Sequence, residues 1–333
     1  MDPVVALQRI GYLLERRPVP LYRSRAFRRA AERIRELGEA EVRRRIADGT
    51  LLETPDIGVT TGEVVIEALD GRVPTYLAKL EAESAASEDS PTAVLRKQLK
   101  GDCHVHTDWS DGRSPIEVMI DSARALGHDY VVITDHSPRL TIARGLSRER
   151  LLEQMRRIDE LNEHLAPFRV LTGIEVDILE DGALDQDPEI LARLDLVVAS
   201  VHSKLRMPRE PMTARMVAAI RNPNMDVLGH ATGRIIVGRG RPESEFDAER
   251  VFAACAEHDK AIEINSRPER LDPPRRLLRE AQRIGCRFSI NTDAHAPGQL
   301  EWLENGCSRA VECDIDAEHV VNTWSLDALR AWT

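Results

Sequence analysis

The chain has 333 residues, of which 42% are hydrophobic and 31% charged, and its formal net charge at pH 7 is −10. These proportions are typical of a soluble globular protein with room for one large domain and one small one. No apolar run approaches the roughly 18 residues of a membrane span, and the N-terminus lacks the pattern of a secretion signal. Five cysteines without a CxxC pair argue against a disulfide framework. We therefore expect a cytoplasmic protein with no membrane partner.

Residues 1–80 are predicted to form a small helical domain. Apolar residues recur there at helical spacing, among them Val5, Ile10 and Phe27, and Gly38 and Gly49 stand where helix ends are expected. Residues 1–50 contain twelve arginines and seven acidic residues, so this segment is basic on an otherwise acidic chain. The charge suits a polyanionic partner, although charge alone favours a solvated helical face.

Residues 81–97 are small, partly acidic and without periodic pattern, which is typical of a linker. From residue 98 onward, strand-like and helix-like segments alternate to the end of the chain. The sequence therefore predicts two domains, residues 1–80 and 98–333, joined by this linker.

Seven short apolar runs in the second domain each end in a residue that can bind a metal ion or support its ligands. They cover residues 102–106, 130–136, 170–175, 196–202, 227–230, 261–265 and 288–295. Apolar runs without polar alternation are typical of strands buried on both faces, and helical segments between them indicate a parallel sheet. In closed sheets of this kind the functional groups lie at the C-terminal ends of the strands.

The polar residues at these ends have the chemistry of a metal cluster. His104 and His106, two apart on one strand, point to the same side, so one ion can take both imidazoles. Glu175 is a lone carboxylate at the end of an apolar strand. Its burial costs several kcal/mol of free energy unless it is paired or bound to metal, so we expect it to bridge two cations. The predicted ligands are His104, His106, Asp111, His136, Glu175, His202, His230, Asp293 and His295. Nine nitrogen and oxygen donors suit three divalent ions of zinc, manganese or iron.

Several such ions together favour hydrolysis of phosphoesters over amides, because they supply hydroxide at neutral pH and neutralise a phosphate. We assign the central catalytic roles to Glu175, Asp293 and His295. The candidate substrate-binding residues lie at or just past strand ends, although surface charge is the default explanation of the basic ones: Lys204, Arg206, Arg234, Arg239 and Asn265. Glu263 and Asn265 are expected to hydrogen-bond to metal ligands or to substrate instead of binding metal themselves.

In order along the chain, these segments resemble the PHP (polymerase and histidinol phosphatase) domain, over about residues 99–333. The motifs are GDCHVHT at 101–107, WSDG at 109–112, ITDHS at 133–137, GIE at 173–175, SVHS at 200–203, GHATGR at 229–234, EIN at 263–265 and NTDAH at 291–295. The resemblance implies a distorted seven-stranded (β/α)7 barrel with three metal ions. It places one ion on His104, His106, Glu175 and Asp293, a second on Glu175, His202 and His230, and a third on Asp111, His136 and His295.

The motifs are most similar to the PHP domain of bacterial X-family DNA polymerases, and the N-terminal region resembles their helix-hairpin-helix domain. This second likeness rests on RSRAFRRAA at 23–31 and TPDIG at 54–58. It implies DNA contacts through Arg23, Arg25, Arg28, Arg29 and Gly58, although Asp56 stands where a glycine is common and would face phosphate unfavourably. Those polymerases carry a nucleotidyltransferase core between the two domains, and here only residues 81–97 occupy that place. We expect no polymerase activity.

Three hypotheses follow. The first is a metal-dependent phosphoesterase acting on DNA ends in repair, as a 3′-5′ exonuclease or a 3′-phosphatase. The second is a small-molecule phosphomonoesterase of the histidinol-phosphatase type. The third, a non-catalytic DNA-binding protein, is disfavoured by the complete set of metal ligands.

Overall fold

The computed structural model describes residues 1–15, 22–83 and 89–333, and these form two compact units, Met1–Ser87 and Glu88–Thr333. Each unit has its own hydrophobic core, since the buried cluster formed by residues 6–80 shares no member with the clusters formed by residues 95–329. Among the described residues, no helix has both the length and the apolar character needed to cross a membrane.

The first unit is entirely helical in its described part, as the sequence predicts. Its elements are α1 (Pro3–Glu15), α2 (Tyr22–Leu37), α3 (Glu39–Ala47), the 3-10 turn η1 (Leu51–Glu53), α4 (Val59–Leu69) and α5 (Thr75–Ala82). Helix α1 packs against α2, α4 and α5 through a buried stripe that includes Leu7 and Ile10. Val5 lies on the same helix but outside this stripe and is 53% exposed.

The segment between the units contains more helix than the sequence predicts. Helix α5 extends to Ala82, and a further helix, α6 (Pro91–Gln98), lies inside the expected linker of residues 81–97. The side chain of Ser90 accepts a hydrogen bond from the backbone N–H of Ala93 at 3.2 Å, and Pro91 occupies the first helical turn. A serine cap followed by proline is a local start signal for a helix, and it overrides the polar composition of the segment.

The second unit is built on seven parallel strands, in the order in which they occur along the chain. They are β1 (Gly101–Val105), β2 (Tyr130–Ile133), β3 (Arg169–Asp177), β4 (Leu196–Ser200), β5 (Val227–Leu228), β6 (Ala261–Asn265) and β7 (Arg287–Asn291). All strand residues are buried except the first ones of β3 and β7. Burial on both faces explains why these runs lack polar alternation.

The strands close on themselves. Val105, at the end of β1, forms a parallel bridge with Ala294 beyond β7, and the backbone N–H of His106 donates to the carbonyl of Ala294 at 2.8 Å. At the opposite end Asn322 joins the same two strands, because its side chain donates to the carbonyls of Gly101 and Ile290. The predicted (β/α)7 barrel is confirmed, and it is nearly closed, with a single bridge joining its first and last strands.

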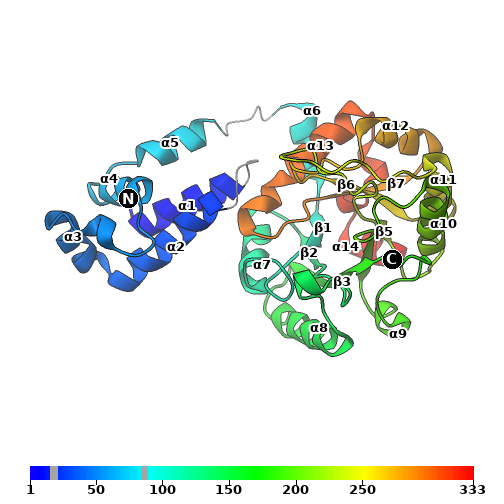
Figure 1. Ribbon diagram of the computed structural model, residues 1–333, viewed down its shortest axis with the longest axis horizontal. Coiled ribbons are helices and arrows are strands. Elements are labelled where there is room, and N and C mark those ends of the chain that lie inside the picture. Colours follow the sequence, from blue (N-terminus) through cyan, green and yellow to red (C-terminus); the bar gives the residue numbers. More distant parts are fainter. Residues whose placement is uncertain (16–21, 84–88) are drawn as a thin grey trace. The chain divides into compact units, whose positions relative to one another are not determined.

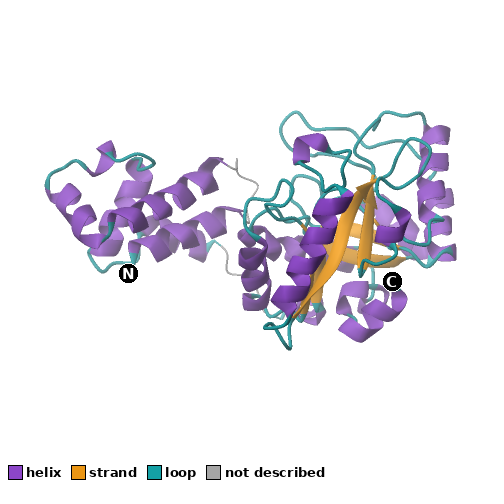
Figure 2. Ribbon diagram, turned by 90° about the horizontal axis from the view of Figure 1, so that it is seen from below, coloured by secondary structure: helices purple, strands orange, loops and turns teal. Residues whose placement is uncertain are grey.

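Helices cover the outside of the strands (Figure 1). They are α7 (Ile116–Ala125), α8 (Arg148–Asn162), α9 (Pro188–Leu191), α10 (Arg209–Ile220), α11 (Ala248–Glu257), α12 (Arg275–Ile284), α13 (Leu303–Glu312) and α14 (Leu326–Trp332), with 3-10 turns η2 (Thr141–Ala143), η3 (Pro297–Trp302), η4 (Ala317–His319) and η5 (Val321–Thr323). Long loops gather at one end of this unit (Figure 2). In a parallel barrel the loops that follow the strands share one face, so residues far apart in the sequence meet there.

Candidate metal centre

The nine predicted ligands lie at or just beyond the C-terminal ends of six strands. His104 belongs to β1 and Glu175 to β3, whereas the other ligands follow β1, β2, β4, β5 and β7 by one to six residues. All but Asp111 and His202 are buried. The structure therefore brings together the whole set.

Glu175 is the hub of this cluster. Its Oε1 lies 3.3 Å from His202 Nε2 and 2.9 Å from His230 Nε2. Its Oε2 lies 3.4 Å from His104 Nε2, 3.6 Å from His106 Nε2 and 2.9 Å from His136 Nδ1. The two oxygens thus face two separate groups of imidazoles, as expected of a carboxylate that bridges two ions.

The electrostatics of Glu175 agree with this position. Burial alone would raise the pKa of its carboxyl, but the positive potential of His202, His104 and His136 lowers that pKa well below its ordinary value. Glu175 is therefore an anion in spite of its burial, and an anionic carboxylate is the form that binds metal ions.

A second group of ligands surrounds Asp111. Its Oδ1 lies 3.5 Å from His136 Nε2 and 3.3 Å from His295 Nε2. The rings of His106 and His295 are close, with centroids 4.3 Å apart. Burial, together with the charges of His295 and His136, lowers the pKa of His106 to about 3, so this imidazole is neutral and able to bind metal.

Three sets drawn from the predicted ligands each place one ligand atom per residue within 4.8 Å of one another, as does an exposed group away from them, Asp316, Glu318 and His319. The three sets are His106, Asp111, His136 and His295; His104, His106 and Glu175; and His136, Glu175 and His202. These sets correspond broadly to the three expected ions, but His106 and His136 each belong to two sets, and His230 and Asp293 belong to none. The division of ligands among ions thus remains a prediction.

Glu263 supports the cluster without being one of the predicted ligands. Its Oε1 lies 2.6 Å from His104 Nδ1 and accepts from the Asn291 amide at 3.0 Å. Its Oε2 accepts from the backbone N–H of His230 at 2.7 Å. A carboxylate on the far nitrogen of a metal-binding histidine fixes the ring and leaves Nε2 facing the ion.

Asp293 has two neighbours that the sequence analysis did not select. Arg267 Nη1 lies 3.4 Å from Asp293 Oδ1, and Arg270 Nε lies 3.3 Å from Asp293 Oδ2. Burial would raise the pKa of Asp293, but Arg267 and other cationic neighbours hold it well below its ordinary value. Both arginines follow β6 in the stretch 266–270, so the search for cations past strand ends that selected Lys204 could also have found them.

A cavity of about 260 Å³ opens onto this cluster. It is lined by Asp111, Arg113, His136, Leu140, Glu175, His202, His230, Arg267, Arg270, Asp293 and His295. Predicted metal ligands thus form one part of the wall, and arginines form another. This arrangement suits a ligand that presents a phosphate to metal ions.

The predicted substrate-binding residues are not among the described residues that line this cavity. Lys204, Arg206 and Arg239 are exposed outside it. Asn265 is fully buried, and its amide donates to Glu263 at 3.1 Å and to the predicted ligand Asp293 at 3.3 Å, which agrees with the first of its two expected roles, hydrogen bonding to metal ligands.

Arg234 also has a different position from the one expected. It donates from Nε to the carbonyl of Arg270 at 3.0 Å and from Nη2 to that of Leu271. Its guanidinium therefore holds the loop that carries Arg267 and Arg270, and this replaces the predicted contact with substrate. The direction of a long side chain depends on partners that are distant in sequence, which explains the error.

The predicted DNA-binding residues of the first unit fall into two groups. Arg23, Arg25 and Arg29 are exposed, and Gly58 precedes α4. Arg28 instead donates two hydrogen bonds, at 2.6 and 2.7 Å, to the buried carboxylate of Glu15, so its guanidinium holds α2 against α1. This is a correction, because a guanidinium used in packing is not free for phosphate.

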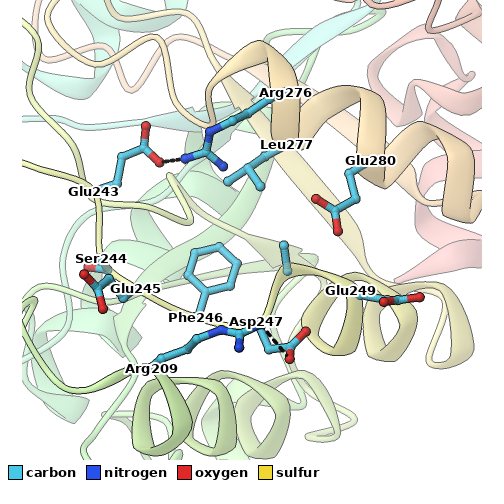
Figure 3. Close-up of a pocket in the computed structure, with 11 residues that line it drawn as sticks. Arg209, Glu243, Ser244, Glu245, Phe246, Asp247, Glu249, Arg276, Leu277 and Glu280 are labelled. Carbon is cyan, nitrogen blue, oxygen red and sulfur yellow. Dashed lines mark hydrogen bonds and ion pairs between the residues drawn. The ribbon is translucent and has the colours of Figure 1, made fainter.

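A second cavity of the barrel unit, of about 630 Å³, lies among α10, α11 and α12 (Figure 3). Its arginines are held by carboxylates, since Arg209 Nη2 lies 2.9 Å from Asp247 Oδ2 and Arg276 pairs with Glu243. None of the nine predicted metal ligands lines it. The smaller cavity at the metal centre is therefore the candidate substrate site.

Comparison with known proteins identifies relatives of the chain. Residues 102–267 match the family model described as the PHP domain. Over 260 residues, or 78% of the chain, the sequence is 36% identical to the DNA polymerase/3'-5' exonuclease PolX of Bacillus subtilis, and the match spans 45% of that protein, less than half its length. It is 30% identical to a probable phosphatase of Acetivibrio thermocellus, over 67% of the chain and 90% of that protein. The crystal structure of histidinol phosphate phosphatase from Lactococcus lactis, complexed with zinc, L-histidinol and phosphate, aligns with a TM-score of 0.46 and 20% identity over 64% of the chain and 92% of that protein.

Proposed function

The chain belongs to the PHP family and is a metal-dependent phosphoester hydrolase, and on that premise we propose that its substrates are the ends of DNA strands. The proposal is carried by one combination: a complete metal-binding cluster in the barrel unit and an arginine-rich helical unit in the same chain. The reaction is removal of a 3′ nucleotide or a 3′ phosphate.

The buried polar atoms of the predicted ligands fit a cluster of bound metal ions. His104 Nε2, His106 Nε2 and Glu175 Oε2 are buried and have no hydrogen-bond partner among the described residues. Buried polar atoms without partners are costly, and three that face one another are explained by a cation between them. We assign the cluster three divalent ions of zinc, manganese or iron, held by the nine ligands. Such ions, when bound, lower the pKa of water and so supply the hydroxide that attacks phosphorus.

The two arginines of the cavity are the residues that we assign to the substrate phosphate. Arg267 and Arg270 line the cavity and lie beside Asp293, so a phosphate that reaches the metal ligands also reaches both guanidinium groups. Arg113 lines the same cavity. Guanidinium groups bind phosphate oxygens through directed, charge-assisted hydrogen bonds and neutralise charge as the bond to phosphorus breaks.

The helical unit supplies binding to the body of the DNA. Arg23, Arg25 and Arg29 are exposed on α2, where they can neutralise phosphates. Asp56 has a positive φ of 65°, the backbone conformation for which glycine is common at this point of a hairpin. Its Oδ1 lies 3.5 Å from Arg29, so the acidic side chain is partly neutralised. We infer that the exposed arginines of α2, more than the hairpin loop, contact DNA.

A small phosphomonoester of the histidinol-phosphate type is the second candidate. The specific observation in its favour is the size of the cavity, about 260 Å³, which suits one phosphate group and a small alcohol. This substrate gives the arginines of α2 no role.

Deletion of residues 1–87 distinguishes the two candidates, because the remaining unit has hydrophobic clusters of its own. We expect the truncated protein to lose about tenfold or more in kcat/KM on a long DNA substrate, since several phosphate contacts disappear. Hydrolysis of p-nitrophenyl phosphate should stay within about twofold. Equal activity of the two proteins on DNA would refute the role of the helical unit. Two single variants are matched for the same comparison. Arg25→Gln removes an exposed arginine of α2, and Arg43→Gln is the control, because Arg43 forms an ion pair with Glu39 within α3.

A further inference from the structure

One loop at the entrance of the catalytic cavity has an unusual surface. The loop, residues 137–146, follows β2 and is called the mouth loop here. Leu140 lines the cavity, and Ile142, two residues further, is 91% exposed, more than any other large hydrophobic side chain among the described residues. The Cα atoms of these two residues are at most about 7 Å apart, because consecutive Cα atoms are about 3.8 Å apart. An exposed apolar side chain therefore stands at the rim of the substrate site.

The mouth loop is held firmly in shape. The backbone N–H of Leu146 donates to the carbonyl of His136 at 2.7 Å, which closes the base of the loop. Asp185 accepts from the Ser137 hydroxyl at 2.9 Å and from the N–H of Arg139 at 2.6 Å. A Cβ atom at Gly145 would lie 1.8 Å from the Ser137 carbonyl, so only glycine permits this close approach. These contacts thus fix the loop backbone in a conformation that exposes Ile142.

The loop is also basic. Residues 138–150 contain four arginines and one glutamate, in a chain with a net charge of −10. Two of these arginines are used within the protein, since Arg150 donates to the carbonyls of Trp109 and Arg144 and Arg148 pairs with Asp187. Arg139 and Arg144 are exposed, and their side chains form no ion pair with the described residues. Two cations therefore flank the apolar tip.

We propose that the mouth loop is a wedge that separates the terminal base pair of a DNA duplex and leads the 3′ end into the cavity. Apolar side chains flanked by cations are what proteins insert between base steps, with the apolar group against the base and the cations on the phosphates. A cavity of about 260 Å³ receives one strand end and not a paired terminus, so a duplex must open before its end reaches the metal ligands. Ile142 covers the base exposed by the opening. This inference rests on the proposed action on DNA ends.

The test compares three substrates of the full-length, manganese-loaded protein: a 3′-labelled single strand, the same strand in a blunt duplex, and p-nitrophenyl phosphate. We expect Ile142→Ala to lower kcat/KM on the duplex by about tenfold, the effect of losing one buried aliphatic contact. Its activity on the single strand and on the small substrate should stay within about twofold. The control is Val94→Ala on α6, which also removes an exposed β-branched side chain, 50% exposed, but away from the mouth loop.

The outcomes separate this inference from the proposed function. Equal effects of Ile142→Ala on single-stranded and duplex DNA overturn the wedge and leave the action on DNA standing. A wild-type protein that hydrolyses only the small substrate overturns both. A loss on all three substrates means that Ile142 supports the fold of the site, and it overturns the wedge as well.

A second measurement does not depend on turnover. A duplex with 2-aminopurine in its terminal base pair becomes brighter when that base unstacks, so binding of the wild-type protein in the presence of a chelator should raise the fluorescence. Ile142→Ala should give less than half of this increase at saturation. Arg144→Gln should lower the slope of log affinity against log salt by about one. An unchanged fluorescence on saturation with the wild-type protein would contradict the proposal.

Discussion

Replacement of Glu263 by glutamine is a sharp test of how the metal centre is organised. The carboxylate is fully buried and accepts from Asn291 and from the backbone N–H of His230, at 3.0 and 2.7 Å. It also accepts from the Asn265 amide at 3.1 Å and lies 2.6 Å from His104 Nδ1. Every partner is a donor when His104 carries its proton on Nδ1. Glutamine has the same shape, but one of its two terminal groups is itself a donor.

The magnitude follows from this mismatch. In Glu263→Gln the amide NH₂ replaces one of the two carboxylate oxygens. It then faces either His104 and Asn291, or the backbone N–H of His230 and the amide of Asn265. In both cases two donors lose their acceptor. A buried donor without a partner costs about 1–3 kcal/mol, so we expect the free energy of unfolding to fall by about 3 kcal/mol. A ring of His104 that is no longer fixed should weaken metal binding and activity by about 10–100-fold, the usual effect of removing such a supporting carboxylate.

Two measurements check this expectation: calorimetric titration of the metal-free protein with manganese, and urea unfolding of the same sample. The matched control is Glu257→Gln, an exposed glutamate at the end of α11, which should change neither quantity. Metal affinity within about twofold of wild type in a folded Glu263→Gln protein would refute the argument that Glu263 orients the ligands. Rescue of affinity in Glu263→Asp would support the need for the charge.

Three further outcomes are expected. Burial raises the pKa of Asp226 to about 6, so between the ordinary carboxyl pKa near 4 and pH 6 the folded protein keeps a proton that the unfolded chain has lost. The free energy of unfolding should therefore fall as pH rises through this window, by about 3 kcal/mol for this group, and urea titrations of Asp226→Asn should show a smaller fall. Removal of metal by a chelator should lower the melting temperature and abolish hydrolysis, and Glu175→Ala should be inactive and insensitive to added manganese; a fully active Glu175→Ala protein would contradict the metal mechanism. Arg267→Gln should raise KM and the inhibition constant of inorganic phosphate by about tenfold with a smaller change in the melting temperature, and unchanged phosphate inhibition would remove Arg267 from the substrate site.

The strands, and the gathering of the nine predicted metal ligands at their ends, could be predicted from the sequence because the information is local. A strand buried on both faces requires a continuous apolar run, and a ligand such as His202 or His230 directly follows such a run. The parallel order then brings the ends together without any knowledge of individual contacts. The position of Glu175 at the hub follows from the same rule.

The roles of the arginines could not be predicted in this way. Arg28 and Arg234 lie in motifs that suggest contact with a ligand, but their guanidinium groups bind Glu15 and the backbone of residues 270 and 271. A long side chain reaches several neighbours, and the choice among them is made by tertiary packing. Arg267 follows β6 as Lys204 follows β4, so the same rule selects both, and only the tertiary structure shows that Arg267 lines the cavity and Lys204 does not.

The central claim is tested most directly by offering the manganese-loaded, full-length protein a 3′-labelled DNA primer–template and histidinol phosphate side by side, with metal content determined on the same sample. The account expects hydrolysis at the DNA 3′ end, with three metal ions per chain. Turnover of histidinol phosphate alone, with the DNA intact, would contradict it.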